Sequence, residues 1–202
     1  MDSPPPSPLR PGVLLDRDGT LCEEMGYLNH ISRLALLPGS AEGIRMLNAA
    51  GIPVAVVTNQ GGVGAGYFPE SFVDEVRREI ERRLAESGAH IDAHYHSPYH
   101  PHGNVAPYNR DSECRKPRPG LAHRASEDLS LDLARSYVVG DRAGDLELAA
   151  RIGARGILVL TGYGRGEWRW NGPGWPSPPD AIVEDLIEAA RWILSDLGVK
   201  ED

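Results

Sequence analysis

The sequence predicts an α/β protein with a three-layer, Rossmann-like architecture, in which a parallel sheet carries helices on both faces. Short apolar runs, typical of strands buried on both sides, alternate along the chain with segments of helical periodicity. This alternation favours helical crossovers between parallel strands. Polar residues follow the apolar runs, and sheets of this kind bind ligands at the carboxyl ends of their strands. We therefore expect a functional site at that end of the sheet.

Four apolar runs are the predicted strands, and each ends where polar or glycine residues begin. The runs cover residues 13–15, 52–57, 136–139 and 156–160. The polar residues that follow them are Asp16, Thr58 with Asn59 and Gln60, Asp141, and Thr161. Because the carboxyl ends of parallel strands meet at one end of a sheet, we expect Asp16, Thr58 and Asp141 to lie close together.

Helices are predicted over residues 40–50, 69–86, 144–152 and 182–197. The second has the clearest pattern, since apolar residues recur every four positions among Arg and Glu, at Phe72, Val76, Ile80 and Leu84. Two segments are too rich in polar, Pro and Gly residues for regular structure. Residues 94–115 are predicted to be a long functional loop, and residues 162–179 a second irregular segment.

One domain over residues 12–199 accounts for most of the chain, and we expect the Pro-rich lead over residues 1–11 to be disordered. At 202 residues, with 41% apolar and 25% charged residues, the chain can bury one core. Residues 22–40 and 59–68 are too short to hold a large cap domain over the strand ends. The loop at residues 94–115 is therefore expected to shape the pocket.

The composition argues against several classes of partner. The net charge of −8 disfavours a nucleic acid or a membrane surface, since both attract basic patches. No apolar run is long enough to span a bilayer, and the start lacks the apolar core of a signal peptide. Two cysteines, Cys22 and Cys114, are too few for a disulfide framework. We expect a cytoplasmic protein, and a monomer, because no apolar stripe remains once the sheet is covered.

The stretch Asp16-Arg17-Asp18-Gly19-Thr20 is the most informative part of the sequence. If the chain turns after the strand, Asp16 can face a phosphorus atom while Asp18 reaches the leaving oxygen, and Gly19 supplies the freedom for that turn. One carboxylate as nucleophile and a second as general acid and then base suffice for two-step ester hydrolysis. The alternative is a surface turn, in which Asp-Gly pairs are common. The position after a buried strand favours catalysis.

The pattern resembles the haloacid dehalogenase superfamily of phosphatases. DRDGT after an apolar strand is similar to its first motif, and Thr58 in VAVVTNQ to its second, a hydroxyl that binds the phosphoryl group. Lys116 in CRKPRPG resembles the third motif, a cation that neutralises charge, and VVGDRAGD the acidic fourth, with Asp141 and Asp145. The motifs occur in the expected order over residues 12–165. The resemblance implies a phosphatase with Asp16 as nucleophile and Asp18 as acid and base.

The resemblance also implies Mg²⁺ as cofactor. A phosphomonoester dianion repels a carboxylate nucleophile, so a metal and cationic groups must screen the charge. Mg²⁺ prefers oxygen ligands, and Asp16, Asp141 and the backbone carbonyl of Asp18 would supply them. Asp145 is a further candidate. It could bind the metal through water, position Lys116 or Asp141, or stabilise the N-terminus of its helix.

Within the superfamily, the details resemble the D-glycero-D-manno-heptose 1,7-bisphosphate 7-phosphatases and the related histidinol-phosphate phosphatases. The similar features are DRDGT followed by Gly26-Tyr27 and LPG, VVTNQ with its glycine-rich follow-on, and CRKPRPG. This branch implies that Arg115 contacts the substrate, and a guanidinium suits a second phosphate or sugar oxygens. We expect Asn59 to be a second substrate ligand, with capping of the strand end as the alternative.

The sequence departs from this branch at two places. Members often bind a structural Zn²⁺ through four ligands, whereas the matching positions here are Ser97, Tyr99, Ser112 and Cys114. A site could be rebuilt from Cys114 and the nearby His94, His96, His100 and His102, but we expect no structural zinc. The arginine that is common before Gly66 is replaced by Ala65, which removes a cation near the substrate.

The sequence therefore predicts an Mg²⁺-dependent phosphomonoesterase of carbohydrate metabolism that acts through an aspartyl phosphate on a small phosphorylated sugar or polyol. Heptose 1,7-bisphosphate, losing its 7-phosphate, is the first candidate, and histidinol phosphate or another small sugar phosphate is the alternative. A non-catalytic module that binds phosphoryl ligands is the alternative of a different class. Trp168, Trp170 and Trp175 are expected to pack at the domain edge, with the wall of a sugar or partner site as the alternative.

Overall fold

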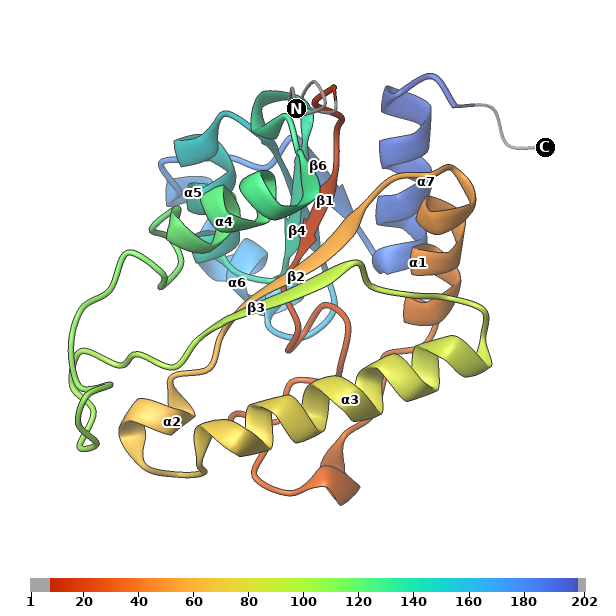
Figure 1. Cartoon of the computed structure of the whole chain (residues 1–202). Helices are drawn as coiled ribbons and strands as arrows, with labels where there is room; N and C mark the ends of the chain where they lie inside the picture. Colours follow the sequence, from red (N-terminus) through yellow and green to blue (C-terminus); the bar gives the residue numbers. More distant parts are fainter. Residues whose placement is uncertain (1–7, 200–202) are drawn as a thin grey trace, which may run out of the picture.

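The predicted strands join one parallel sheet in the computed structural model, which describes residues 8–199. Within these residues the sheet has six strands: β1 (Val13–Leu15), β2 (Val54–Asn59), β3 (Ala93–Ser97), β4 (Tyr137–Gly140), β5 (Arg155–Val159) and β6 (Ala181–Val183). They lie in the order β3-β2-β1-β4-β5-β6, and neighbours are parallel (Figure 1). The carboxyl end of β1 thus lies between those of β2 and β4, where the strand order reverses and such sheets bind ligands.

Helices cover both faces of the sheet, so the predicted three-layer architecture is confirmed. The helices are α1 (Ser40–Ala49), α2 (Gly62–Ala65), α3 (Glu70–Glu86), α4 (Gly120–Leu129), α5 (Ala143–Ile152), α6 (Gly164–Trp170) and α7 (Leu186–Asp196), with 3-10 turns η1 (Ile31–Arg33), η2 (Leu133–Arg135) and η3 (Gly172–Gly174). Successive side chains of a strand point to opposite faces. Leu15 therefore belongs to one apolar cluster with α1, α3 and α7, and Leu14 to a second with α4 and α5.

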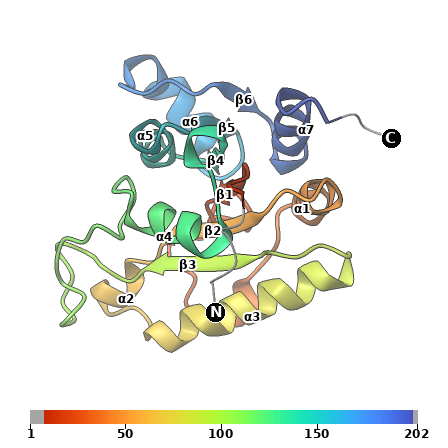
Figure 2. The same ribbon diagram turned by 45° about the horizontal axis from the view of Figure 1, so that its top comes forward.

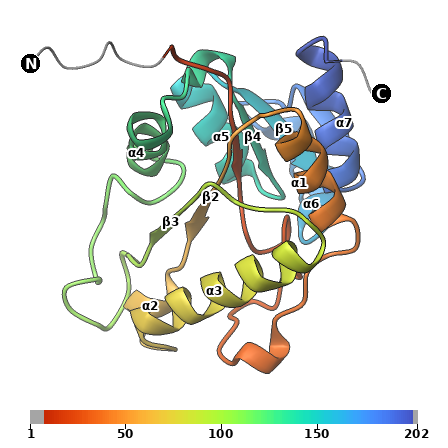
Figure 3. The same cartoon turned by 45° about the vertical axis from the view of Figure 1, so that its right-hand side comes forward.

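The layers can be followed in two further views. Figure 2 shows α4 and α5 on one side of the sheet and α1 and α7 on the other. Figure 3 shows α3 and α4 on opposite sides of β3. Helices thus shield both faces of the sheet, whereas the ends of its strands are not covered by these helices and can hold polar groups.

Strand β1 is short, and its position is set by the core. All three of its residues are fully buried, and Leu14 lies in register with Ala55 on β2 and Val138 on β4. Burial of an aliphatic side chain of this size stabilises the fold by about 1.5–3 kcal/mol. The ladder ends where the backbone N–H of Asp16 donates to the carbonyl of Val139 at 2.9 Å. The core therefore fixes Asp16 at the end of the central strand.

Most predicted elements are found within a few residues of their expected bounds. The helices expected over residues 40–50, 69–86 and 144–152 are α1, α3 and α5. In α3 the buried residue of the first turn is Val73 rather than Phe72, because the buried stripe continues from Val73 to Val76, Ile80 and Leu84. Phe72 is only partly buried against the same cluster.

Three segments differ from the prediction. Residues 94–97, expected to begin the irregular loop, belong to the edge strand β3, because pairing with β2 satisfies their backbone despite their polar sequence. The helix expected from residue 182 begins as β6, and α7 starts after Asp185, whose side chain accepts the N–H of Glu188 as an N-cap. Helix α6 lies inside the segment 162–179 that is expected to be irregular, and α4 is not among the predicted helices.

The N-terminal lead and the segments after β1 and β2 are both subjects of sequence predictions. Residues 1–7 of the predicted disordered lead lie outside the described residues. Arg10 does not fit that prediction, because its N–H donates to the carbonyl of Ser130 at 3.1 Å and it forms a bridge with Leu131. In the described part of the chain, the connections after β1 and β2 hold η1 and α2, so the expected minimal cap is confirmed. Across residues 8–199, the helices are too short or too polar to cross a membrane.

Candidate active site

Polar side chains from several segments meet at the carboxyl ends of β1, β2 and β4. They line a cavity of about 240 Å³, with contributions from Asp16, Asp18, Thr58, Asn59, Arg115, Lys116 and Asp145. Asp141 follows β4 and is fully buried beside Asp16 and Asp145. The structure thus brings together the residues that the sequence predicts for the site.

Gly19 allows the chain to turn after β1. Its φ of 83° lies in the left-handed region that favours glycine. A Cβ at this position would lie 2.1 Å from Oδ2 of Asp141. The turn is closed by the N–H of Gly19, which donates to the carbonyl of Cys22 at 2.7 Å. The predicted turn is therefore present, and the glycine also makes room for Asp141.

Lys116 is a buried cation between two carboxylates. Its Nζ lies 2.9 Å from Oδ1 of Asp16 and 2.7 Å from Oδ1 of Asp145, and its side chain is 5% exposed. Burial alone would lower the pKa of this ammonium, but Asp145 and Asp16 outweigh burial and raise the pKa above its ordinary value. Lys116 is therefore charged at physiological pH and neutralises part of the surrounding negative charge.

Asn59 fixes the backbone at Lys116. Its Nδ2 donates to the carbonyl of Lys116, and its Oδ1 accepts the N–H of the same residue, both at 3.0 Å. Both polar atoms of the amide are thus engaged, although Asn59 lines the cavity. This geometry favours a role in positioning Lys116 over the predicted direct contact with substrate.

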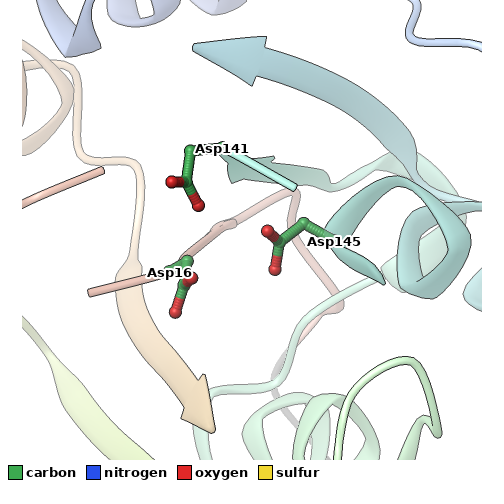
Figure 4. A group of neighbouring side chains, drawn as sticks. All are labelled: Asp16, Asp141 and Asp145. Carbon is green, nitrogen blue, oxygen red and sulfur yellow. The ribbon is translucent and has the colours of Figure 1, made fainter. Parts of the chain in front are cut away.

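Asp16, Asp141 and Asp145 form an acidic cluster (Figure 4). One oxygen from each carboxylate lies within 4.8 Å of the others. Burial, and next the charge of Asp16, raise the pKa of Asp141 to about 8. Its Oδ2 accepts the N–H of Tyr163 at 2.8 Å, whereas its buried Oδ1 has no hydrogen-bond partner among residues 8–199. A hard cation such as Mg²⁺ fits this set, because it binds carboxylate oxygens and would satisfy the unpaired one.

Both oxygens of Asp145 have partners within the protein. Its Oδ1 pairs with Lys116, and its Oδ2 accepts the N–H of Arg142 at 3.2 Å in the first turn of α5. Burial raises the pKa of Asp145 to about 6, and the charge of Lys116 counteracts that rise. This geometry supports two of the alternatives for Asp145, the positioning of Lys116 and the stabilisation of the N-terminus of α5.

Asp18 is held by two residues that are not among the predicted functional residues. The guanidinium of Arg17 donates to both oxygens of Asp18, and the amide of Gln60 donates to Oδ2. Gln60 also donates to Oγ1 of Thr58 at 3.0 Å. Arg17 escapes notice because neighbours on an extended chain normally point to opposite sides. The same periodicity could have found Gln60, which lies two residues after Thr58 and so shares its side of the strand.

The rest of the cavity is lined by charged, aromatic and small residues. Arg115 donates from NH1 to the carbonyl of Tyr99 at 2.9 Å, and burial lowers the pKa of its guanidinium. The guanidinium of Arg142 lies 3.9 Å from the centre of the Tyr163 ring. The remaining lining residues are Glu24, Gly26, Tyr27, Gly61, His100 and Gly144. Arg142 is not among the predicted site residues, although it directly follows Asp141 at the end of β4.

The histidines considered for zinc lie in different surroundings. His94 is mostly buried, which lowers its pKa to about 4, and His96 lies 2.9 Å from Glu70. His100 lines the cavity. Within the described residues, the side chains that gather closely enough to hold a metal are those of the acidic cluster, and neither the histidines nor Cys114 form such a group.

Trp168, Trp170 and Trp175 stand apart from the cavity. Trp168 packs edge-on against Trp175, with ring centres 6.0 Å apart. Trp170 is 74% exposed, and the guanidinium of Arg169 lies 4.8 Å from its ring centre. These three side chains do not line the cavity at the strand ends. Trp168 and Trp175 pack against each other as expected, whereas the mostly exposed Trp170 does not fit the expected packing.

Comparison with known proteins leads to one family. A family model described as HAD-hydrolase-like matches residues 113–189. The D-glycero-D-manno-heptose-1,7-bisphosphate 7-phosphatase of Thermosynechococcus vestitus is 40% identical over 197 residues, which are 94% of this chain and 98% of that protein. The D-glycero-beta-D-manno-heptose-1,7-bisphosphate 7-phosphatase of Yersinia pestis is 38% identical over 190 residues, which are 93% of this chain and 92% of that protein.

Solved structures share the fold. The D,D-heptose 1,7-bisphosphate phosphatase from B. bronchiseptica, complexed with magnesium and phosphate, has a TM-score of 0.82 at 30% identity and covers 92% of this chain and 99% of its own. The corresponding enzyme from Burkholderia thailandensis has a TM-score of 0.66 at 31% identity, with the same coverage of 92% and 99%.

Proposed function

Because the chain belongs to the haloacid dehalogenase-like hydrolases, we propose that it is a magnesium-dependent phosphomonoesterase that removes the 7-phosphate of D-glycero-D-manno-heptose 1,7-bisphosphate. The observation that carries this proposal is the position of Asp16. It ends the central strand, lines a cavity, and lies 2.9 Å from the buried ammonium of Lys116. Relatives that span nearly the whole chain carry the name of this activity.

In the first step, a carboxylate oxygen of Asp16 attacks the phosphorus atom of the 7-phosphate. The bond between phosphorus and the sugar oxygen breaks as an aspartyl phosphate forms. Asp18, which lines the same cavity, donates a proton to the departing oxygen, so the sugar leaves as an alcohol. Asp18 is then a carboxylate.

In the second step, water attacks the phosphorus atom of the aspartyl phosphate. Asp18 takes a proton from this water, the bond between phosphorus and Asp16 breaks, and inorganic phosphate leaves. Asp16 returns as a carboxylate and Asp18 as an acid. One water molecule is consumed for each ester that is cleaved.

Charge is the main obstacle, because a phosphate dianion must approach an acidic cluster of three carboxylates. Lys116 lies against Asp16 and is placed to neutralise both the nucleophile and the phosphoryl oxygens. The hydroxyl of Thr58 accepts from Gln60, so its own proton is free to be donated to the phosphoryl group. Mg²⁺, held by Asp16, Asp141 and the backbone carbonyl of Asp18, would add positive charge at the same place.

The two arginines of the cavity suit a substrate with a second phosphate. Arg115 and Arg142 line the cavity together with the catalytic residues, and NH2 of Arg142 lies 3.6 Å from Oε2 of Glu24. A guanidinium binds phosphate oxygens through two parallel hydrogen bonds, so each arginine can recognise a phosphate by its geometry as well as by its charge. This lining favours a bisphosphate over a monophosphate. The identity of the sugar and the position of the phosphate that is removed are inferred from the names of the relatives.

Histidinol phosphate and other small sugar phosphates carry the same reacting group and are the alternatives within the class. The test is phosphate release with Mg²⁺ across a panel of both heptose bisphosphate anomers, histidinol phosphate and common sugar phosphates, by the wild type and by D16N. We expect a heptose bisphosphate to be turned over fastest, and no turnover by D16N. Best turnover of histidinol phosphate would overturn the substrate assignment. A wild type that hydrolyses no ester would leave the binding module as the function.

A further inference from the structure

Arg17 lies between the two catalytic aspartates in the sequence, and it is buried. Its side chain is 5% exposed, and its guanidinium is committed to Asp18, with Nε 3.0 Å from Oδ1 and NH2 2.7 Å from Oδ2. Two parallel hydrogen bonds of this kind hold a carboxylate in the plane of the guanidinium. The catalytic carboxylate is therefore fixed in direction as well as in position.

Gln60 braces this pair, and the orientation of its amide follows from chemistry. Arg17 can only donate, so the Gln60 atom that lies 2.9 Å from NH2 is the carbonyl oxygen. The amide nitrogen then faces Oδ2 of Asp18 at 2.9 Å and Oγ1 of Thr58 at 3.0 Å. Gln60 is 4% exposed, so its own side chain is shielded from water.

The donor count leaves one oxygen of Asp18 with spare capacity. Oδ2 accepts from both Arg17 and Gln60, whereas Oδ1 accepts from Arg17 alone among the described residues. Each carboxylate oxygen offers two lone pairs, so Oδ1 keeps one for a transferred proton. The side chain of Asp18 is 24% exposed, and the residue lines the cavity.

We infer that Arg17 is a positioning residue that aims Oδ1 of Asp18 at the leaving oxygen, with Gln60 as its brace. The inference rests on the proposed function, because Asp18 transfers protons only in that reaction. A general acid works within hydrogen-bond reach of the oxygen that it protonates, and small displacements are costly. Without Arg17, the carboxyl of Asp18 would rotate and spend less time in the productive direction.

A purely structural ion pair makes a different prediction. Breaking it would impair all substrates alike, because the whole site would be disturbed. Loss of positioning impairs only those substrates whose leaving group needs a proton. A sugar leaves as a strongly basic alkoxide and needs protonation, whereas p-nitrophenolate is a stable leaving group and needs little. The two roles can therefore be separated by the choice of ester.

The experiment measures kcat/KM for heptose 1,7-bisphosphate and for p-nitrophenyl phosphate in wild type and R17M, with Mg²⁺ present. This constant covers the steps up to departure of the leaving group, so hydrolysis of the aspartyl phosphate does not enter. We expect R17M to lower it about 10- to 100-fold for the sugar phosphate and less than about threefold for the aryl phosphate, since general acid catalysis contributes about 10²–10⁴-fold. D18N should show the same selectivity, and R17M/D18N should be no slower than D18N on the sugar phosphate.

R45M is the matched control, because Arg45 is an exposed arginine that pairs with Glu42 on α1, and it should leave both constants unchanged. R17K serves if R17M does not fold, since it keeps the buried charge and gives up only the two-point contact. It should show the same selectivity with a smaller loss. Equal losses on both esters, or no loss on the sugar phosphate, would overturn the inference and leave the proposed function standing. A wild type that hydrolyses neither ester would overturn both.

Discussion

The ion pairs of Lys116 can be tested by removing its charge. The ammonium lies 2.9 Å from Asp16 and 2.7 Å from Asp145, and the Lys116 and Asp145 side chains are only 5% and 3% exposed. The substitution K116M keeps a long apolar side chain and deletes the cation. The carboxylates of the acidic cluster, which have oxygens within 4.8 Å of one another, then lose the positive charge that neutralises part of their repulsion.

The expected loss is large because the remaining charges are buried. Removing one partner of a buried ion pair costs about 3–5 kcal/mol, so we expect K116M to lower the free energy of unfolding by about that amount at pH 8 in EDTA. The loss should shrink as the pH falls. Burial already raises the pKa of Asp145 to about 6, and without Lys116 that pKa rises further. The carboxyl of Asp145 then becomes protonated at low pH and no longer needs a cation.

Urea unfolding followed by tryptophan fluorescence measures this free energy. R118M is the control, because Arg118 lies in the same loop, is 40% exposed and pairs with acidic residues at 3.3–3.4 Å. The R118M substitution should lower the free energy of unfolding by less than about 1 kcal/mol. Adding D145N to K116M should restore part of the stability, since one unpaired carboxylate is removed. A K116M protein that is as stable at pH 8 as R118M would refute this reasoning.

Three further predictions concern other parts of the molecule. G19A should raise the Mg²⁺ concentration needed for half-maximal activity, because the added Cβ would collide with Asp141. A magnesium titration of activity that matches the wild type would contradict this prediction. Burial raises the pKa of the Cys22 thiol to about 12, so iodoacetamide should label Cys114 in the folded protein and reach Cys22 only after unfolding, as mass spectrometry can show. Glu70 accepts a hydrogen bond from the hydroxyl of Tyr108 at 2.5 Å and pairs with His96 on β3, so it ties the loop to the edge strand. E70Q should therefore speed tryptic cleavage within residues 98–115 several-fold, and unchanged cleavage would argue against this role of Glu70.

The sequence predicts best the residues whose place depends on backbone periodicity. Asp16, Thr58 and Asp141 follow apolar runs, and parallel strands bring such residues to one end of the sheet whatever the details of packing. The two helix layers follow in the same way from apolar spacing. Lys116 comes from a loop, and its resemblance to a family motif, rather than its spacing, placed it at the site.

The remaining features depend on contacts that a sequence does not display. Edge strand β3 has a polar sequence and is stabilised by pairing with β2. No local sequence pattern predicts this pairing. Arg17 turns toward Asp18 because the chain bends at Gly19. The side-chain amide of Asn59 is hydrogen-bonded to the backbone of Lys116, which lies 57 residues away in the sequence. Side-chain direction at a bend and partners distant in sequence are set by tertiary structure.

The central claim is that Asp16 carries the phosphoryl group during turnover. Sodium borohydride reduces an acyl phosphate to an alcohol, so trapping with borohydride during hydrolysis of heptose 1,7-bisphosphate in Mg²⁺ should convert residue 16 to homoserine. Peptide mass spectrometry would locate the change, and it should be absent without substrate. Rapid hydrolysis with Asp16 unmodified, or with the label on another carboxylate, would contradict the account.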